Sequence, residues 1–178
     1  MNMPGLRLLL TTLLLGATLS ACSSITSSTT CEDTEQAAAA LDRLPELQLR
    51  PARATPVAGA TNKAYCTQDS GDAWLTAERL YAHHGSRAGV QEYYTREAAA
   101  AGWRPVQDPN TGAGDSTSAL CFESSGQPSL TLAFESQEDL REFYGVKPGP
   151  ELSGRDARIW FSWSTETAPD GSPMGCSG

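Results

Sequence analysis

Histidine is nearly absent from this chain of 178 residues, and its two histidines, His83 and His84, are neighbours. A general base or metal ligand of this type must be one of the two. Adjacent side chains point to opposite faces of a strand and diverge by about 100° on a helix. The pair therefore cannot readily hold one metal ion through both rings, and we expect a polar turn here that leads into a helix.

The sequence also lacks the short motifs of several enzyme classes. It has no G-x-S-x-G elbow, and the Gly-Asp-Ser run at 114–116 lies in a glycine-rich loop without a partner motif, so serine hydrolase chemistry is unsupported. It has no P-loop and no G-x-G-x-x-G motif, so nucleotide binding is unsupported as well. We expect no cofactor, and the chain has no internal repeat.

Basic residues are few: 13 Lys and Arg stand against 21 Asp and Glu, which gives a net charge of −8. An acidic surface of this kind repels nucleic acid and anionic lipid headgroups. The length suits one domain with its own core. We therefore expect no nucleic-acid partner, and membrane attachment would have to come from apolar groups.

No apolar run is long enough to cross a bilayer as a mature helix, which takes roughly twenty residues. The run at 8–20 is uncharged and largely apolar, and it follows a short start whose charged residue is Arg7. A basic start, a short apolar core and small residues at the exit are typical of a secretion signal that is removed.

The end of this run, Leu19-Ser20-Ala21-Cys22, resembles the lipobox of bacterial lipoproteins at all four positions. The resemblance implies that a signal peptidase recognises Leu19, Ser20 and Ala21, that Cys22 carries acyl chains, and that 1–21 is removed. Two or more acyl chains give a stable anchor, whereas one holds only reversibly. Residues 22–30, rich in Ser and Thr, would be a flexible tether, and the protein would lie on the extracytoplasmic face of the cell membrane. The alternative is an ordinary secretion signal with a coincidental cysteine.

The other cysteines are Cys31, Cys66, Cys121 and Cys176. None of them lie close enough together for the short ligand spacing of a zinc site, so we expect no metal. An even number in an exported protein predicts two disulfides, for which three pairings are open. Loop-closure entropy slightly favours Cys31–Cys66 with Cys121–Cys176.

Two helices are expected from periodicity and capping in the domain at 31–178. The first begins near Thr30 as its cap, has apolar residues at helical spacing from Ala37 to Leu44, and stops at Pro45. The main helix covers 86–101, is capped by Ser86, and ends at Gly102 with Trp103 folding back onto its last turn. Between them, 49–72 reads as an extended loop that ends in a turn at 69–72.

Alternating patterns predict strands in the second half of the chain. A hairpin is expected from the runs at 118–124 and 129–136, followed by one or two helical turns at 136–145. A strand at 157–166 places Ile159, Phe161 and Trp163 on one apolar face. Trp160 lies on the opposite face. We expect it to belong to the core, as tryptophans of a small exported domain usually do. The alternative is that it is partly exposed and a candidate partner contact, with Tyr81 or Tyr93 beside it.

Residues 74–82 suit either a helix or a strand, and propensity alone mildly favours the helix. The stretch from Trp74 to Tyr81, the pair Tyr93-Tyr94 and the pair Gly102-Trp103 resemble small, mostly uncharacterised lipoproteins of high-GC Gram-positive bacteria. That resemblance implies a strand at 74–82 and assigns no activity.

Together these patterns predict an α+β domain, in which one main helix packs on an antiparallel sheet of four to five strands and a short helix precedes it. The function expected is a non-enzymatic, lipid-anchored binding domain for an envelope protein or polymer. The alternative is a lipid-anchored hydrolase acting on wall or secreted polymers, with the acidic residues of 108–116 as catalysts. The pairs Asp69/Asp72 and Asp108/Asp115 lack the ligand repeat of a calcium loop, and turn formation is the commoner reason for such Asp residues.

Overall fold

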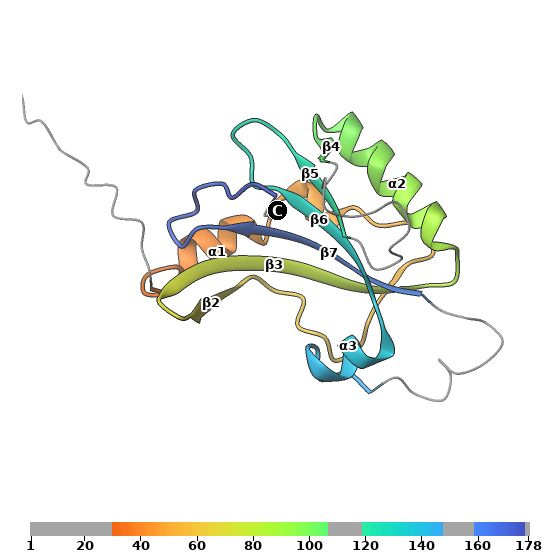
Figure 1. The fold of residues 1–178 in the computed structure, drawn as a ribbon, viewed down its shortest axis with the longest axis horizontal. Helices are drawn as coiled ribbons and strands as arrows, with labels where there is room; N and C mark the ends of the chain where they lie inside the picture. The colour runs from red at the N-terminus through yellow and green to blue at the C-terminus, as the bar shows by residue number, and fades with distance from the viewer. Residues whose placement is uncertain (1–29, 107–118, 148–158, 177–178) are drawn as a thin grey trace, which may run out of the picture.

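The computed structural model describes residues 30–106, 119–147 and 159–176, and it confirms the α+β class. In these residues one antiparallel sheet of seven strands is accompanied by three α-helices and a short 3-10 helix (Figure 1). None of the helices in the described ranges is long and apolar enough to cross a membrane. The predictions for the signal peptide, Leu19 to Cys22, the tether before Thr30 and the acidic loop at 108–116 lie outside the described residues.

The strands lie in the order β1-β3-β7-β6-β5-β4, and β2 pairs with β3 on the same edge as β1. Their bounds are β1 Thr55–Pro56, β2 Tyr65–Asp69, β3 Asp72–His83, β4 Arg104–Val106, β5 Leu120–Glu123, β6 Leu130–Glu135 and β7 Ile159–Thr167. The expected number of four to five strands was too low. The segment predicted as a loop at 49–72 supplies β1 and β2, and β4 follows the main helix. Strands of two or three residues are too short to give an alternating pattern, so β1 and β4 carry no sequence signal.

The central strand is β3, and the predicted strand at 74–82 lies inside it. It pairs with β7 along one side and with β1 and β2 along the other. Hydrogen bonds to these three strands satisfy its backbone N–H and C=O groups, and they favour a strand over the helix that propensity suggests. The turn predicted at 69–72 is also confirmed. Its two central residues, Ser70 and Gly71, have φ of 50° and 97°, as a two-residue type I′ hairpin turn requires.

The first helix, α1 (Glu35–Leu41), begins later than predicted. Its N-cap is Thr34 rather than Thr30, because Asp33 has a φ of 55° and a right-handed helix cannot run through that conformation. The Thr34 hydroxyl donates to the Cys31 carbonyl instead of capping the helix. Pro45 lies after the helix end and starts the 3-10 helix η1 (Pro45–Gln48).

The main helix, α2 (Arg87–Ala100), agrees with its prediction. The Ser86 side chain accepts a hydrogen bond from the Gly89 N–H at the start. At the end, Gly102 has a φ of 92°, its N–H donates to the Ala99 carbonyl, and the Trp103 N–H donates to the Ala98 carbonyl. This is the Schellman pattern, and it turns Trp103 back into the core.

One face of the sheet packs against α1, η1 and α2 and forms the main core. Its centre is a cluster of rings in which Tyr94 stacks on Trp163 at 4.3 Å between centroids, with Phe122 and Phe161 edge-on to them. The polar atoms of these rings are bonded to the backbone of the N-terminal segment: the Tyr94 hydroxyl donates to Leu49 and the Trp163 indole to Glu46. The N-terminal segment is thereby fixed onto the sheet.

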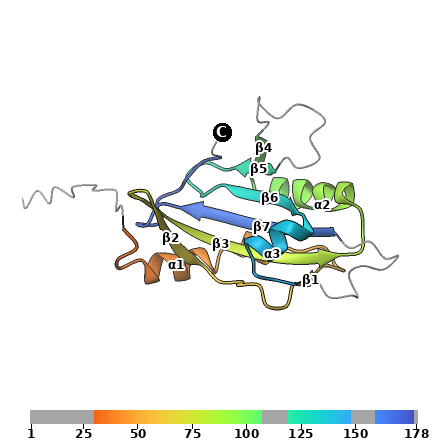
Figure 2. The same cartoon turned by 60° about the horizontal axis from the view of Figure 1, so that its bottom comes forward.

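The opposite face is partly covered by the short helix α3 (Gln137–Glu142), which lies in front of the sheet in Figure 2. Ser136 caps α3 as predicted, in a reciprocal capping box with Asp139. Leu140 and Val146 pack on Leu80 and Trp160 and form a second apolar cluster. Gly145 follows with a φ of 63°.

The prediction that Trp160 belongs to the core is confirmed, and the alternative of an exposed partner contact is wrong, because α3 covers it. Its side chain faces away from the main core, as the alternation indicated, but it is 8% exposed. Its indole nitrogen is buried without a hydrogen-bond partner. Trp160 therefore belongs to the second apolar cluster and is not available as a partner contact. Tyr81 is buried in the main core, and Tyr93 is partly buried and packs against that core.

Candidate binding site

Beyond α3, the same face of the sheet is open and carries polar side chains in register. Residues directly paired across strands point to the same face. One row joins Tyr65 of β2, Thr76 of β3 and Glu166 of β7, and the next contains Glu78 of β3 with Ser164 of β7. The sheet thus brings carboxylates, hydroxyls and an aromatic ring together from strands that are far apart in the sequence.

A groove of about 660 Å³ lies on this open face. Its described lining has three kinds of side chain: the aromatic rings of Tyr65, Trp74, Phe143 and Tyr144, the carboxylates of Glu78 and Glu166, and the hydroxyls of Thr61, Thr67, Thr76 and Ser164. The volume is in the range of small-molecule sites, which typically combine aromatic walls with a few polar groups.

Two of the rings are unusually exposed for apolar side chains. Among the described residues the large exposed hydrophobic side chains are Tyr65, Val106 and Phe143, and the first and last of these line the groove. Phe143 is 74% exposed. Contact with water is unfavourable for such rings, and both leave apolar surface at the groove accessible to a ligand.

The carboxylate of Glu78 is part of a network under the end of α3. The Tyr144 hydroxyl lies 2.8 Å from Glu78 Oε1 and 3.3 Å from Glu135 Oε1. The Ser162 hydroxyl donates to the same oxygen of Glu135 at 2.7 Å. Because a phenol has one proton to donate, the two carboxylates compete for a single donor, and their oxygens are close together.

This arrangement changes the acidity of the groups involved. Burial raises the pKa of Glu78, and the carboxylates of Glu135 and Glu166 raise it further, against the opposing effect of the hydrogen bond from Tyr144. Burial and the neighbouring Glu78 also raise the pKa of the Tyr144 hydroxyl. Burial, and then the carboxylates of Glu78 and Glu166, raise the pKa of the Tyr65 hydroxyl. Glu135 and Glu166 therefore each repel the carboxylate of Glu78.

Glu166 also lines the groove, and its Oε1 accepts a 3.3 Å hydrogen bond from the Thr76 hydroxyl. The described lining includes no lysine or arginine. Within the described ranges, no group of three or more His, Cys, Asp or Glu residues is arranged to hold a metal ion. The groove thus combines negative charge with aromatic walls and lacks a compensating cation among its described lining residues.

A second groove of about 540 Å³ lies between α1 and the C-terminal turn. Its walls are mostly alanine, leucine and proline, and its acidic residues include Asp33 and Asp170. Asp170 is used locally: its Oδ1 accepts from the Ser172 N–H, and the side chain and then the backbone of Ser172 lower the pKa of Asp170. Its polar lining residues are Asp33, Gln36, Thr167 and Asp170, and its described lining includes no aromatic ring, so we assign the candidate site to the groove on the open face.

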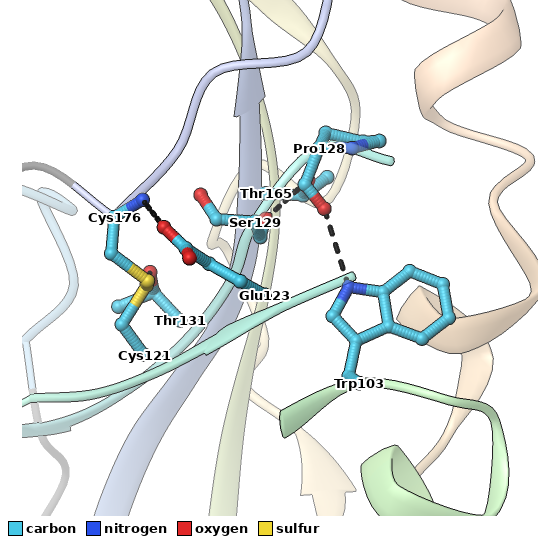
Figure 3. The surroundings of a disulfide bond; sticks show 8 residues. All are labelled: Trp103, Cys121, Glu123, Pro128, Ser129, Thr131, Thr165 and Cys176. Carbon is cyan, nitrogen blue, oxygen red and sulfur yellow. Dashed lines mark hydrogen bonds between the residues drawn. A yellow bond between two sulfur atoms is a disulfide. The ribbon is translucent and has the colours of Figure 1, made fainter. Parts of the chain in front are cut away.

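The disulfide prediction is confirmed in the structure, with the pairing that loop closure slightly favours. Cys31 is bonded to Cys66 and Cys121 to Cys176. Figure 3 shows the second bond, where Glu123 Oε1 accepts a hydrogen bond from the Cys176 N–H. Nearby in the same view, the Trp103 indole reaches the Pro128 carbonyl. Both disulfides tie a segment near one end of the domain to the sheet.

The remaining candidates lie away from the groove or outside the described residues. His83 ends β3 with its Nδ1 buried and unpartnered, and His84 next to it is exposed. Asp69 and Asp72 flank the β2–β3 turn, as a turn-forming role predicts. The pair Asp108 and Asp115 lies outside the described residues.

Sequence reasoning missed the groove residues altogether. One local signal was present: Trp74, Thr76 and Glu78 alternate with the buried Leu75 and Ala77, which is a strand with one polar face. Nothing in the sequence places Phe143 and Tyr144, which follow α3, over that face.

Compared with known proteins, the chain matches no family model, and no curated protein or solved structure is significantly similar to it. The lipoprotein family suggested by the lipobox and by the run from Trp74 to Trp103 therefore stays a prediction.

Proposed function

We propose that this chain is a membrane-anchored lipoprotein whose α+β domain binds a component of the cell envelope and catalyses no reaction of its own. Acyl chains on Cys22 would hold it on the extracytoplasmic face of the cell membrane. The lipobox supports the anchor, and the two disulfides suit an oxidising compartment outside the cytoplasm. The binding role is carried by one observation: exposed aromatic side chains gather at a groove that also holds carboxylates.

The anchor is tested by Cys22→Ala in the native host. We expect the variant to appear in the medium or the soluble fraction, because the acyl chains supply the membrane affinity. Ser23→Ala, which leaves the lipobox intact, should stay with the membrane. Mass spectrometry of the native protein should find a mature chain that begins at an acylated Cys22. A Cys22 with a free thiol, or one bonded to another cysteine, would contradict the anchor.

The binding role is tested by comparing the full-length chain, purified in a neutral detergent, with a double variant, Trp74→Ala and Phe143→Ala. Each protein is immobilised and exposed to an extract of envelope proteins and polymers. We expect a component that the native chain retains and the double variant loses. The control is Val106→Ala, which removes an exposed apolar side chain outside the groove. Retention that is equal for all three proteins would contradict a binding role for the groove.

A second candidate function, a lipid-anchored hydrolase of wall or secreted polymers, is favoured by one specific observation. Glu78 has a raised pKa and shares its groove with Glu166, and a glycoside hydrolase uses a raised-pKa acid with a second carboxylate. If the chain is such a hydrolase, the purified protein should release reducing ends from wall polymer, which is the measurement that tests this function. Glu78→Gln should abolish that release while binding persists, and absence of any release leaves the binding role.

A further inference from the structure

The charge of the groove indicates what it binds. Glu78 and Glu166 line it, and Glu135 lies behind Tyr144 with its oxygen 3.3 Å from the same hydroxyl that Glu78 contacts. Burial raises the pKa of Glu78, and repulsion by Glu135 and Glu166 raises it further. An anionic ligand would add to this repulsion, a neutral ligand would leave it in place, and a cation would remove it.

The aromatic side chains that line the groove indicate which kind of cation would bind there. The faces of aromatic rings attract organic cations, and the attraction grows when water is excluded. Tyr65 and Phe143 are exposed rings, and Trp74, which also lines the groove, is half-buried. A bare metal ion gains little from rings and needs several oxygen ligands at once, and no such cluster exists in the described part of the chain.

We propose that the groove on the open sheet face binds a positively charged organic group, an ammonium or a guanidinium, between the carboxylates of Glu78 and Glu166 and the rings of Trp74 and Phe143. The proposal rests on the proposed function, because it names the ligand chemistry of the same groove. The ligand presents a cation at the end of an apolar stem, as lysine and arginine side chains do, so that the stem contacts the rings and the charge reaches the carboxylates.

The experiment is an NMR titration of the full-length chain in a neutral detergent at low salt. The probes are n-butylammonium and n-butylguanidinium, with n-butanol as the neutral match and butyrate as the anionic one. The indole N–H of Trp74, assigned by its loss in Trp74→Phe, reports on the groove. The indole of Trp103, which is buried and bonded to the Pro128 carbonyl, is the internal control.

We expect both cations to shift the Trp74 signal to saturation at millimolar concentrations, while butanol and butyrate leave it nearly unchanged. The stronger of the two cations identifies the group as an ammonium or a guanidinium. Glu166→Gln and Glu78→Gln should each weaken binding about threefold or more at low salt, because each removes one charge from the site. Glu92→Gln, the same change at an exposed position of α2, should leave it unaltered.

The proposal is overturned if butanol shifts Trp74 as strongly as the cations do, if neither cation binds, or if both groove variants bind as tightly as the native chain. These outcomes are separate from failure of the proposed function. An envelope component that is retained through Trp74 and Phe143 in the absence of any cation binding would leave the binding role standing and reject the ligand class.

Discussion

At the scale of single residues, Trp160 and Phe143 differ in burial: Trp160 is 8% exposed and Phe143 is 74% exposed. Trp160 alternates with core residues along β7 and is nonetheless buried, because Leu80, Leu140 and Val146 surround it. Phe143 follows directly after α3 and points to solvent at the rim of the groove. An aromatic side chain on the second face is thus buried or exposed according to whether α3 covers it.

This difference predicts unequal effects of truncation. Trp160→Ala should lower the free energy of unfolding by about 3–5 kcal/mol, because it empties a packed site. Phe143→Ala should change it by less than about 0.5 kcal/mol, because little packing is lost at an exposed position. Urea unfolding of the two variants measures both values. Equal effects of the two substitutions would contradict the conclusion that α3 buries Trp160 and leaves Phe143 exposed.

Glu78 gives a prediction on pH. Its pKa in the folded protein is raised above the ordinary value of 4.5, mainly by burial, so the folded state disfavours the ionised form. The resulting destabilisation is present above the raised pKa and disappears as the pH falls towards 4.5. Glu78→Gln should therefore be more stable than the native chain at pH 8, and the difference should shrink at pH 5.

Urea unfolding at the two pH values measures the effect of Glu78→Gln. Glu92→Gln on the exposed face of α2 is the matched control and should give nearly the same difference at both pH values. A Glu78→Gln variant that is less stable than the native chain at pH 8 would show that the hydrogen bond from Tyr144 outweighs burial and repulsion.

At the scale of elements, α2 is held at both ends by local sequence and in the middle by the core. Ser86 caps its start, and Val90, Tyr94 and Ala98 form its buried face. Its end depends on the left-handed conformation of Gly102, which lets Trp103 turn back. By contrast, β3 has no comparable local signal and owes its conformation to pairing with strands on both sides.

Gly102→Ala should therefore lower the free energy of unfolding by about 1–2 kcal/mol, since a Cβ is unfavourable in the left-handed region. Beyond its own chain neighbours, no atom of the described residues lies within 4 Å of the position that this Cβ would take, so the cost is one of backbone conformation and not of a clash. Gly102→Asn should recover part of the loss, because Asn tolerates this region better. Thermal unfolding compares the two variants, and equal losses would argue against a conformational cause.

At the scale of the whole molecule, the disulfides join the beginning and end of the domain to the sheet. Cys31 precedes α1 and is bonded to β2, and Cys176 near the C-terminus is bonded to β5. Near the C-terminus, the Cys176 N–H also donates to Glu123 and the Ser129 N–H donates to the Met174 carbonyl. The short β1 and β4 at the two edges of the sheet add little pairing.

Replacing Cys121 and Cys176 together by Ser should cost about 2–5 kcal/mol of stability, the usual range for removal of a native disulfide. The pair Cys31 and Cys66 should behave similarly. Chemical unfolding of both double variants under non-reducing conditions measures these losses. Peptide mapping of the native chain by mass spectrometry should recover Cys31 with Cys66 and Cys121 with Cys176, and any other pairing would contradict the structure.

The sequence by itself determined the features that depend on neighbours along the chain. The helix at 86–101 has its cap, its periodic apolar face and its terminal glycine within one short stretch, from Ser86 to Gly102. The β5–β6 hairpin has two alternating runs joined by a short turn. The alternation in β7 also placed Trp160 and Trp163 on opposite faces. Each of these follows from local geometry, because the backbone fixes which side chains share a face.

Tertiary structure alone decided what covers each face. Tyr144 meets Glu78 across 66 positions of sequence, and α3 buries Trp160 while leaving Glu166 and Trp74 open. The additional strands β1, β2 and β4 likewise exist only because an edge of the sheet was free to accept them. Periodicity sets the direction of a side chain, whereas burial and acidity depend on distant segments that pack against it. The groove could therefore be found only once those segments were in place.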